Sequence, residues 1–223
     1  MARPPGHGAS FEPRRREIVD RAAALFAQRG YAATSITEIC DAVGLARGAL
    51  YYYIGSKEEL LVEIQAVVLV PLLESAHRIA ALDAPATVRL RLLSEVLLDI
   101  VMERLDHIWV YEHDYRLLSD PHRAKLVRQR HEFEDTVVGL LGEAVEAGEF
   151  HAMDLRLAML QFLNLHNHTY TWVRADGRWD AATLSEAYCA TLFAGFRGPP
   201  GETSALKAEV ARFRAATGHA AHA

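Results

Sequence analysis

The residues between positions 47 and 57 combine fixed positive charge with phenol hydroxyls. Lys57 can bind a phosphate oxygen together with free backbone N–H groups, and Arg47 is the candidate to read the edge of a guanine. Three consecutive tyrosines, Tyr51, Tyr52 and Tyr53, lie between these two cations. A phenol ring can contact a thymine methyl group while its hydroxyl binds a phosphate oxygen. The segment therefore predicts a surface for nucleic acid.

The three tyrosines would point in different directions if the segment is a helix. At about 100° per residue, Leu50 and Ile54 share one side and Tyr52 lies opposite that side. Tyr51 and Tyr53 each stand on a flank, so we expect them to face the two phosphate walls of a groove while Tyr52 faces base edges. The alternative interpretation is an ordinary exposed helix with one aromatic residue in the core.

Two short helices around a glycine would present this surface. Ser35 precedes apolar residues at helical spacing and predicts a capping box with Glu38. Gly44 follows, where a left-handed turn favours glycine. A short helix, a glycine turn and a second short helix form the helix-turn-helix arrangement, whose second helix enters the major groove of DNA. A longer helix is predicted before it, over residues 14–29.

Helical periodicity continues along the rest of the chain, and no segment has a convincing strand period. The fold class predicted is therefore all-α. Glycine, proline and aspartate mark the breaks between the elements. The predicted helices cover residues 57–79 (with a bend near Pro71), 85–106, 107–118, 121–148, 154–174 and 180–196.

Composition narrows the class of protein. The net charge is −5, but residues 1–61 hold eight Lys/Arg against seven Asp/Glu, so the acidic excess lies outside the tyrosine segment. Two cysteines are too few for a disulfide framework and are expected to be free thiols. The N-terminus has no apolar signal segment. Polar side chains within residues 157–173 argue against a membrane span. We expect a soluble, cytoplasmic protein with no membrane association.

Catalytic and metal motifs are missing from the sequence. No serine lies in a GxSxG elbow, and the eleven histidines form no HExxH motif or i, i+4 pair. We therefore expect no catalytic residues, no metal site and no cofactor, and the protein is not expected to be an enzyme.

The run TSITEICDAVGLARGALYYYIGSKEELL, residues 34–61, resembles the DNA-binding domain of the TetR family of bacterial transcriptional regulators. The resemblance extends over about residues 14–62. It differs at Ala46, where a serine or threonine usually caps the third helix, a cap worth about 1 kcal/mol. Tyr52 replaces the commoner histidine and Ile54 the commoner phenylalanine. The positions that the resemblance implies in DNA contact are Ser35, Arg47, Gly48, Tyr51, Tyr53 and Lys57.

The resemblance also implies a domain organisation. Residues 1–62 would form the three-helix DNA-binding domain, with 1–13 as a flexible lead-in. Residues 63–198 would form a helical ligand-binding and dimerisation domain, and 199–223 a flexible tail. The homodimer would associate through helices 154–174 and 180–196, and a two-fold dimer implies a palindromic operator.

Two groups of residues are candidates for ligand binding. In the uncharged stretch 157–173, four polar side chains fall within about 100° of arc, and they would line either a cavity or the dimer interface. In residues 108–118, three further side chains share a face at i, i+4, i+7 spacing, which is suited to a small-molecule pocket or to a partly buried helix. These residues are Asn164, Asn167, His168 and Thr171 in the first group, and Trp109, His113 and Arg116 in the second.

Residues 147–188 are similar to a subgroup of TetR regulators that sense acyl-CoA thioesters of fatty-acid and sterol catabolism. Members often carry Asn-Trp-Thr, a Trp-Tyr pair and a Pro-Asp-Gly turn, where this chain has Asn167-His168-Thr169, Trp172-Val173 and Ala175-Asp176-Gly177. The sequence predicts a repressor that a small-molecule effector, an acyl-CoA, releases from double-stranded DNA. The alternatives are a TetR-type repressor of a multidrug or antibiotic efflux pump, and a helical enzyme or carrier.

Overall fold

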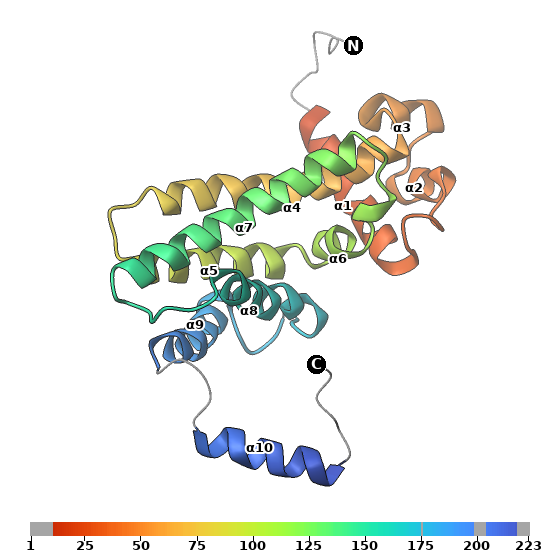
Figure 1. Cartoon of the computed structure of the whole chain (residues 1–223). Coiled ribbons are helices and arrows are strands. Elements are labelled where there is room, and N and C mark those ends of the chain that lie inside the picture. The colour runs from red at the N-terminus through yellow and green to blue at the C-terminus, as the bar shows by residue number, and fades with distance from the viewer. Residues whose placement is uncertain (1–10, 175, 199–203, 218–223) are drawn as a thin grey trace.

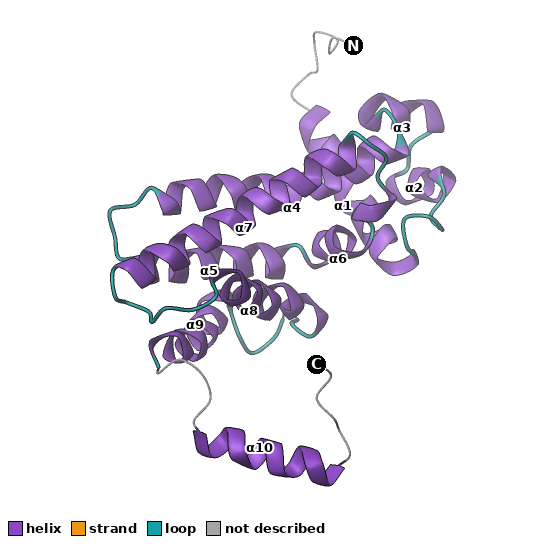
Figure 2. Cartoon of the chain, in the orientation of Figure 1, coloured by secondary structure: helices purple, strands orange, loops and turns teal. Residues whose placement is uncertain are grey.

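The computed structural model describes residues 11–174, 176–198 and 204–217. Every regular element within these ranges is a helix, as Figure 2 shows, so the predicted all-α fold is confirmed. The elements are α1 (Phe11–Arg29), α2 (Ile36–Val43), α3 (Arg47–Ile54), α4 (Lys57–Ala80), α5 (Ala86–Glu103), α6 (Leu105–His113), η1 (Tyr115–Leu117), α7 (His122–Glu146), α8 (Leu155–Asn167), η2 (His168–Thr171), α9 (Ala181–Arg197) and α10 (Ser204–Thr217).

The local signals around α2 and α3 act as the sequence predicts. The Ser35 hydroxyl accepts a hydrogen bond from the Glu38 amide at 3.2 Å, and the Glu38 carboxylate accepts one from the Ser35 amide at 2.7 Å. Gly44 ends α2 with φ of 64°, a left-handed conformation that suits glycine. Ala46 precedes α3 and provides no side-chain cap, so the first turn of α3 lacks one of its usual hydrogen bonds.

The start of α1 differs from the sequence-based expectation. Residues 11–13 were assigned to a flexible lead-in, but α1 begins at Phe11. Pro13 is compatible with this start because the amides of the first helical turn have no partner inside the helix. The Phe11 ring is buried, since it stacks on Tyr53 at 4.9 Å between centroids and meets the edge of Tyr52 at 5.6 Å.

The longer helices form the body of the molecule (Figure 1). α4 and α7 run side by side, α5 packs against both, and α8 and α9 cover the opposite side of α5. The three N-terminal helices α1, α2 and α3 lie at one end of this body, where α1 packs on α6. α4 is long and apolar enough to cross a membrane, but half of its most apolar stretch is buried inside the protein, as expected for a core helix.

Two predicted helices end earlier than expected. The helix predicted over 107–118 stops at His113 and is followed by η1, and the helix predicted over 154–174 stops at Asn167 and tightens into η2. The Thr169 hydroxyl donates to the Leu165 carbonyl within this tightened turn. The segment predicted as a flexible tail contains a helix, α10, which lies apart from the helical body in Figure 1.

A buried polar chain ties α5, α8 and α9 together. The Ser94 hydroxyl lies 2.6 Å from His166 Nε2, and the Ser185 hydroxyl donates to Ser94 Oγ at 2.6 Å. His166 Nδ1 lies 2.7 Å from the Phe162 carbonyl, so this nitrogen carries the proton and Nε2 accepts. Burial lowers the pKa of His166 to about 4. The neutral imidazole therefore fixes α8 on α5.

Candidate functional site

The side chains of α3 are distributed as the helical wheel predicts. Leu50 is fully buried and Ile54 is nearly so. Tyr52 is 58% exposed, whereas Tyr51 and Tyr53 on either flank are partly buried. α3 therefore presents one phenol outward, with a second and a third at the sides of the exposed face.

The other predicted contact residues lie around the same face. Arg47 is exposed at the first position of α3, and its guanidinium lies 5.6 Å from the centre of the Tyr51 ring. Gly48 is exposed beside it, and a Cβ atom there would meet no atom within 4 Å. Ser35 is exposed at the start of α2. The open space over Gly48 allows a partner to approach the backbone of α3 closely.

Two arginines of α1 hold α2 and α3 in place. Arg15 donates through Nε to the Tyr53 carbonyl at 3.3 Å and makes a two-pronged ion pair with Glu63 of α4 at 2.6 and 2.7 Å. Arg14 donates to the Val43 carbonyl at the end of α2. Sequence reasoning missed both residues. The basic run of residues 14–16, directly before the buried residues of α1, is the sequence feature that could have indicated them.

The Lys57 ammonium contacts another part of the protein. Its ammonium donates to the Tyr31 carbonyl at 2.5 Å and lies 4.2 Å from the centre of the Tyr31 ring. Partial burial lowers the pKa of Lys57. The ammonium would have to leave this carbonyl before it could contact a phosphate.

Several polar contacts join the helix-turn-helix region to α6 and α7. The Tyr31 amide donates to Asp114 Oδ2 at 3.2 Å, and burial raises the pKa of that carboxyl group. Glu58, in the first turn of α4, accepts from the Ser119 amide at 2.9 Å and lies 3.2 Å from His122 Nδ1. Hydrogen bonds from Ser119 lower the pKa of Glu58 to about 2. The position of the N-terminal helices is therefore coupled to the segments on either side of η1.

An internal cavity of about 50 Å³ lies between α4, α5, α6, α7 and α8. Most of its wall consists of apolar side chains, among them Val68 and Leu72 of α4 and Ile108 of α6. This volume holds a few water molecules at most. Small-molecule pockets in proteins are larger, roughly 300–1,000 Å³. A larger ligand could enter only if these helices moved apart.

One side of the cavity is polar. Arg130 lines it, and its Nη2 pairs with Glu112 Oε2 at 3.2 Å. The Arg130 guanidinium lies over the rings of Tyr111 and Tyr115, at 4.6 and 4.7 Å from their centres. Arg130 Nη1 is buried and has no hydrogen-bond partner among the described residues. This N–H group is available to an acceptor oxygen on a ligand.

The structure places only one of the seven predicted ligand-binding residues, Asn167, in the wall of this cavity. Trp109 and His113 instead stack on each other at 4.2 Å, and His113 meets the edge of the Tyr170 ring. Arg116 is exposed beside Tyr115. The face chosen on α6 was therefore wrong for this cavity, because Tyr111 and Glu112 of the same helix line it.

The remaining three predicted residues, Asn164, His168 and Thr171, are exposed. They share α8 and η2 with Leu157 and Leu160, which are 55% and 43% exposed. α9 adds a row of exposed small residues beside this apolar surface. That row consists of Ala187, Ala190, Ala194 and Gly195.

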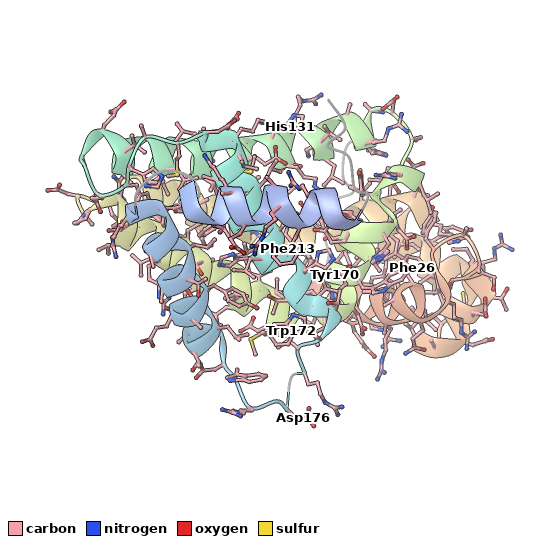
Figure 3. The ribbon with its side chains drawn as sticks, turned by 60° about the horizontal axis from the view of Figure 1, so that its bottom comes forward. Phe26, His131, Tyr170, Trp172, Asp176 and Phe213 are labelled. Carbon is pink, nitrogen blue, oxygen red and sulfur yellow. The ribbon has the colours of Figure 1, made fainter. Side chains whose placement is uncertain are left out.

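The connection from η2 to α9 carries two exposed indoles. Trp172 and Trp179 meet edge to face at 6.1 Å, and Figure 3 shows the connection projecting from the helical body at Asp176. Within the described ranges, no group of three or more His, Cys, Asp or Glu side chains is arranged to hold a metal ion.

Comparisons with known proteins agree with this geometry. A family model described as bacterial regulatory proteins of the tetR family matches residues 18–64, and one described as the Tetracyclin repressor-like C-terminal domain matches residues 83–196. The transcriptional repressor KstR2 of Rhodococcus jostii (strain RHA1) is 29% identical over 208 residues, which is 89% of this chain and 99% of KstR2.

Two solved structures are also similar. The ketosteroid transcriptional regulator KstR2 of Mycobacterium tuberculosis is 26% identical with a TM-score of 0.78, over 83% of this chain and 96% of that one. AibR, solved in complex with isovaleryl coenzyme A and operator DNA, is 25% identical with a TM-score of 0.72, over 81% of this chain and 98% of its own.

Proposed function

Because the chain belongs to the TetR family of DNA-binding transcriptional regulators, which are not enzymes, we propose that it is a repressor released from its operator by an acyl thioester. One observation carries the proposal. The internal cavity has an apolar wall, and the unpartnered Nη1 of Arg130 is a donor for a carbonyl oxygen. A related regulator, AibR, has been solved with isovaleryl coenzyme A.

The proposed DNA contacts lie on α2, α3 and the start of α4. Tyr52 is the most exposed of the three tyrosines and would read base edges, while Tyr51, Tyr53 and Arg47 would bind phosphates. Ser35, Gly48 and Lys57 complete the proposed contact set. Because Lys57 donates to Tyr31, its role would begin with the exchange of this carbonyl for a phosphate oxygen.

The proposed dimer interface is the exposed apolar surface of α8 and α9. Leu157 and Leu160 would pack against the partner, and the small residues of α9 would allow two helix backbones to approach closely. The four helices of two protomers would form an antiparallel bundle in the middle of the dimer. Two α3 helices related by a two-fold axis would read a palindromic operator. We place the repressor in the cytoplasm, where its operator is.

Helix α4 extends from the DNA-binding region to the internal cavity. Its residues Val68 and Leu72 line the cavity, and its first residue, Lys57, contacts the α1–α2 connection. An acyl group larger than the cavity would displace this wall and move the start of α4. A ligand releases DNA only if it binds the non-DNA conformation more tightly, so effector and operator must weaken each other's binding.

The test is a gel shift of the protein on its own upstream DNA with isovaleryl-CoA, longer acyl-CoAs, free CoA and the matching free acids. Release by an acyl-CoA, with much weaker release by free CoA, is the expected result. The Arg130→Gln variant should still bind DNA but need at least tenfold more acyl-CoA for release. Retention of DNA at saturating concentrations of every acyl-CoA would contradict the proposed effector.

A second effector class is favoured by the acidic side chains of the cavity. Glu112 and Glu134 both line it, and carboxylates in an apolar pocket attract organic cations. Release by cationic drugs, without release by any acyl-CoA, would identify the protein as a repressor of an efflux pump. Arg130, paired with Glu112, opposes this interpretation by neutralising one of the two carboxylates.

A further inference from the structure

A second hollow lies on the outer side of α4, between α4 and α7, with a volume of about 230 Å³. Its floor consists of apolar side chains of α4, among them Val62, Ala66 and Leu69. Val68 and Leu72 of the same helix line the internal cavity instead. The two spaces share no lining residue, although α4 and α7 contribute to both. We call the outer one the α4–α7 groove.

The polar side chains of the α4–α7 groove are donors and amides. His122 and Lys125 line it from α7, and Gln65 and Gln129 line it from the two helices. No aspartate or glutamate of the described chain lines it, in contrast to the internal cavity with Glu112 and Glu134. Lys125 therefore gives an anion favourable potential here, and the one carboxylate recorded at His122, that of Glu58, lies 3.2 Å from its Nδ1 outside the lining.

Two of these polar groups have spare hydrogen-bonding capacity. Gln65 is 1% exposed; its Nε2 donates to the Val110 carbonyl, but its Oε1 has no partner among the described residues. Lys125 is exposed at the rim and forms no ion pair in the part of the chain that the structure describes. A buried unpartnered oxygen is costly, and a bound water would relieve it.

The groove has a polar end and an apolar end. His122 and Lys125 lie on the first turns of α7, near the N-terminal helices, and Val70 lies at the far end, 42% exposed. Residues 62–70 of α4 span about 12 Å at 1.5 Å per residue. We propose that this groove binds an amphipathic monocarboxylate, with its carboxylate at His122 and Lys125 and its apolar tail along α4 toward Val70.

A ligand in the α4–α7 groove would affect the DNA-binding region through contacts that the internal cavity does not use. His122 lies 3.2 Å from Glu58, which sits in the first turn of α4 next to Lys57. A carboxylate bound at His122 competes with Glu58 for that imidazole. The groove is thus a second effector site, separate from the thioester site, which acts on the start of α4 directly.

Binding is measured by isothermal titration calorimetry of the full chain without DNA, with octanoate as the probe and 1-octanol as its uncharged counterpart. We expect octanoate to bind at least tenfold more tightly than octanol. Lys125→Glu should weaken octanoate binding at least tenfold, while Lys207→Glu, the same charge reversal on α10, should leave it unchanged. Ala66→Trp should abolish binding of both probes by filling the groove.

Several results would overturn the proposal. These are no octanoate binding to the parent, equal affinity for octanol, or full octanoate binding by Ala66→Trp and Lys125→Glu. Loss of binding in Arg130→Gln but not in Lys125→Glu would place the carboxylate in the internal cavity and would also overturn it. None of these outcomes depends on DNA release, so the thioester proposal stands or falls separately.

Discussion

The buried imidazole of His166 should make the stability of this protein depend on pH. Its Nε2 accepts from Ser94 and its Nδ1 donates to the Phe162 carbonyl, at 2.6 and 2.7 Å. The side chain is fully buried, and burial lowers its pKa from 6.5 to about 4. Between these two pKa values, the His166 imidazole is neutral in the folded chain and protonated in the unfolded chain.

The direction of the effect follows from this difference. Above about pH 6.5 the imidazole is neutral in both states and stability does not depend on it. Between pH 6.5 and about 4 only the unfolded state binds the proton, so the free energy of unfolding falls as the pH falls. At about 1.4 kcal/mol for each pH unit, the loss is on the order of 3 kcal/mol per protomer.

The assay is urea unfolding at fixed protein concentration, followed by far-ultraviolet circular dichroism from pH 7.5 to pH 4. The control is His166→Phe, which keeps the aromatic volume and removes the titrating group. The His166→Phe variant should have a lower free energy of unfolding than the parent at pH 7.5, because the Ser94 hydroxyl loses its hydrogen-bond acceptor. The free energy of unfolding of the parent should then fall by about 3 kcal/mol more than that of the variant. Parallel pH profiles would refute the reasoning, since His166 would then titrate alike in both states.

Three further predictions concern the DNA-binding surface. Tyr52→Ala should change the bases that the protein selects from a random duplex library. Tyr51→Phe should instead weaken binding to every sequence alike, because it removes only a phosphate contact. An identical sequence preference for Tyr52→Ala and the parent would contradict the assignment of Tyr52 to base edges. Arg47→Ala should flatten the slope of log affinity against log salt by about one to two per dimer, and an unchanged slope places Arg47 off the backbone. Phe11→Ala should lower the free energy of unfolding by about 1–3 kcal/mol through the lost stacking on Tyr53, and no loss in chemical denaturation would show that the start of α1 is unimportant.

The helix-turn-helix region could be predicted residue by residue because its signals are local. A capping serine at 35, a glycine at 44 and apolar residues at helical spacing each act within one turn of the chain. Phe11 was missed because its partners, Tyr52 and Tyr53, are about forty positions away in the sequence. Burial of a residue next to a Pro/Gly-rich segment depends on that distant contact.

The ligand cavity could not be predicted in the same way. Helical periodicity shows that α6 is amphipathic, but it does not show which neighbour each side faces. Arg130 lies on α7, far in sequence from Tyr111 and Glu112, and only the packing of α4 to α8 brings them together. Of the predicted polar stripe, Asn167 lines the cavity, while the exposed Asn164, His168 and Thr171 leave the dimer-interface alternative open. The chain tightens after Asn167 into a 3₁₀ turn of about 120° per residue, so a wheel drawn at 100° misplaces Thr171.

Two copies of α3 are proposed to read DNA through Tyr52 and its neighbours. The most direct measurement is selection of bound sequences from a random duplex library by the purified full-length protein. We expect an inverted repeat whose half-sites are centred one helical turn apart, or a multiple of it. A selected pool without a shared motif, or with a single unrepeated half-site, would contradict it.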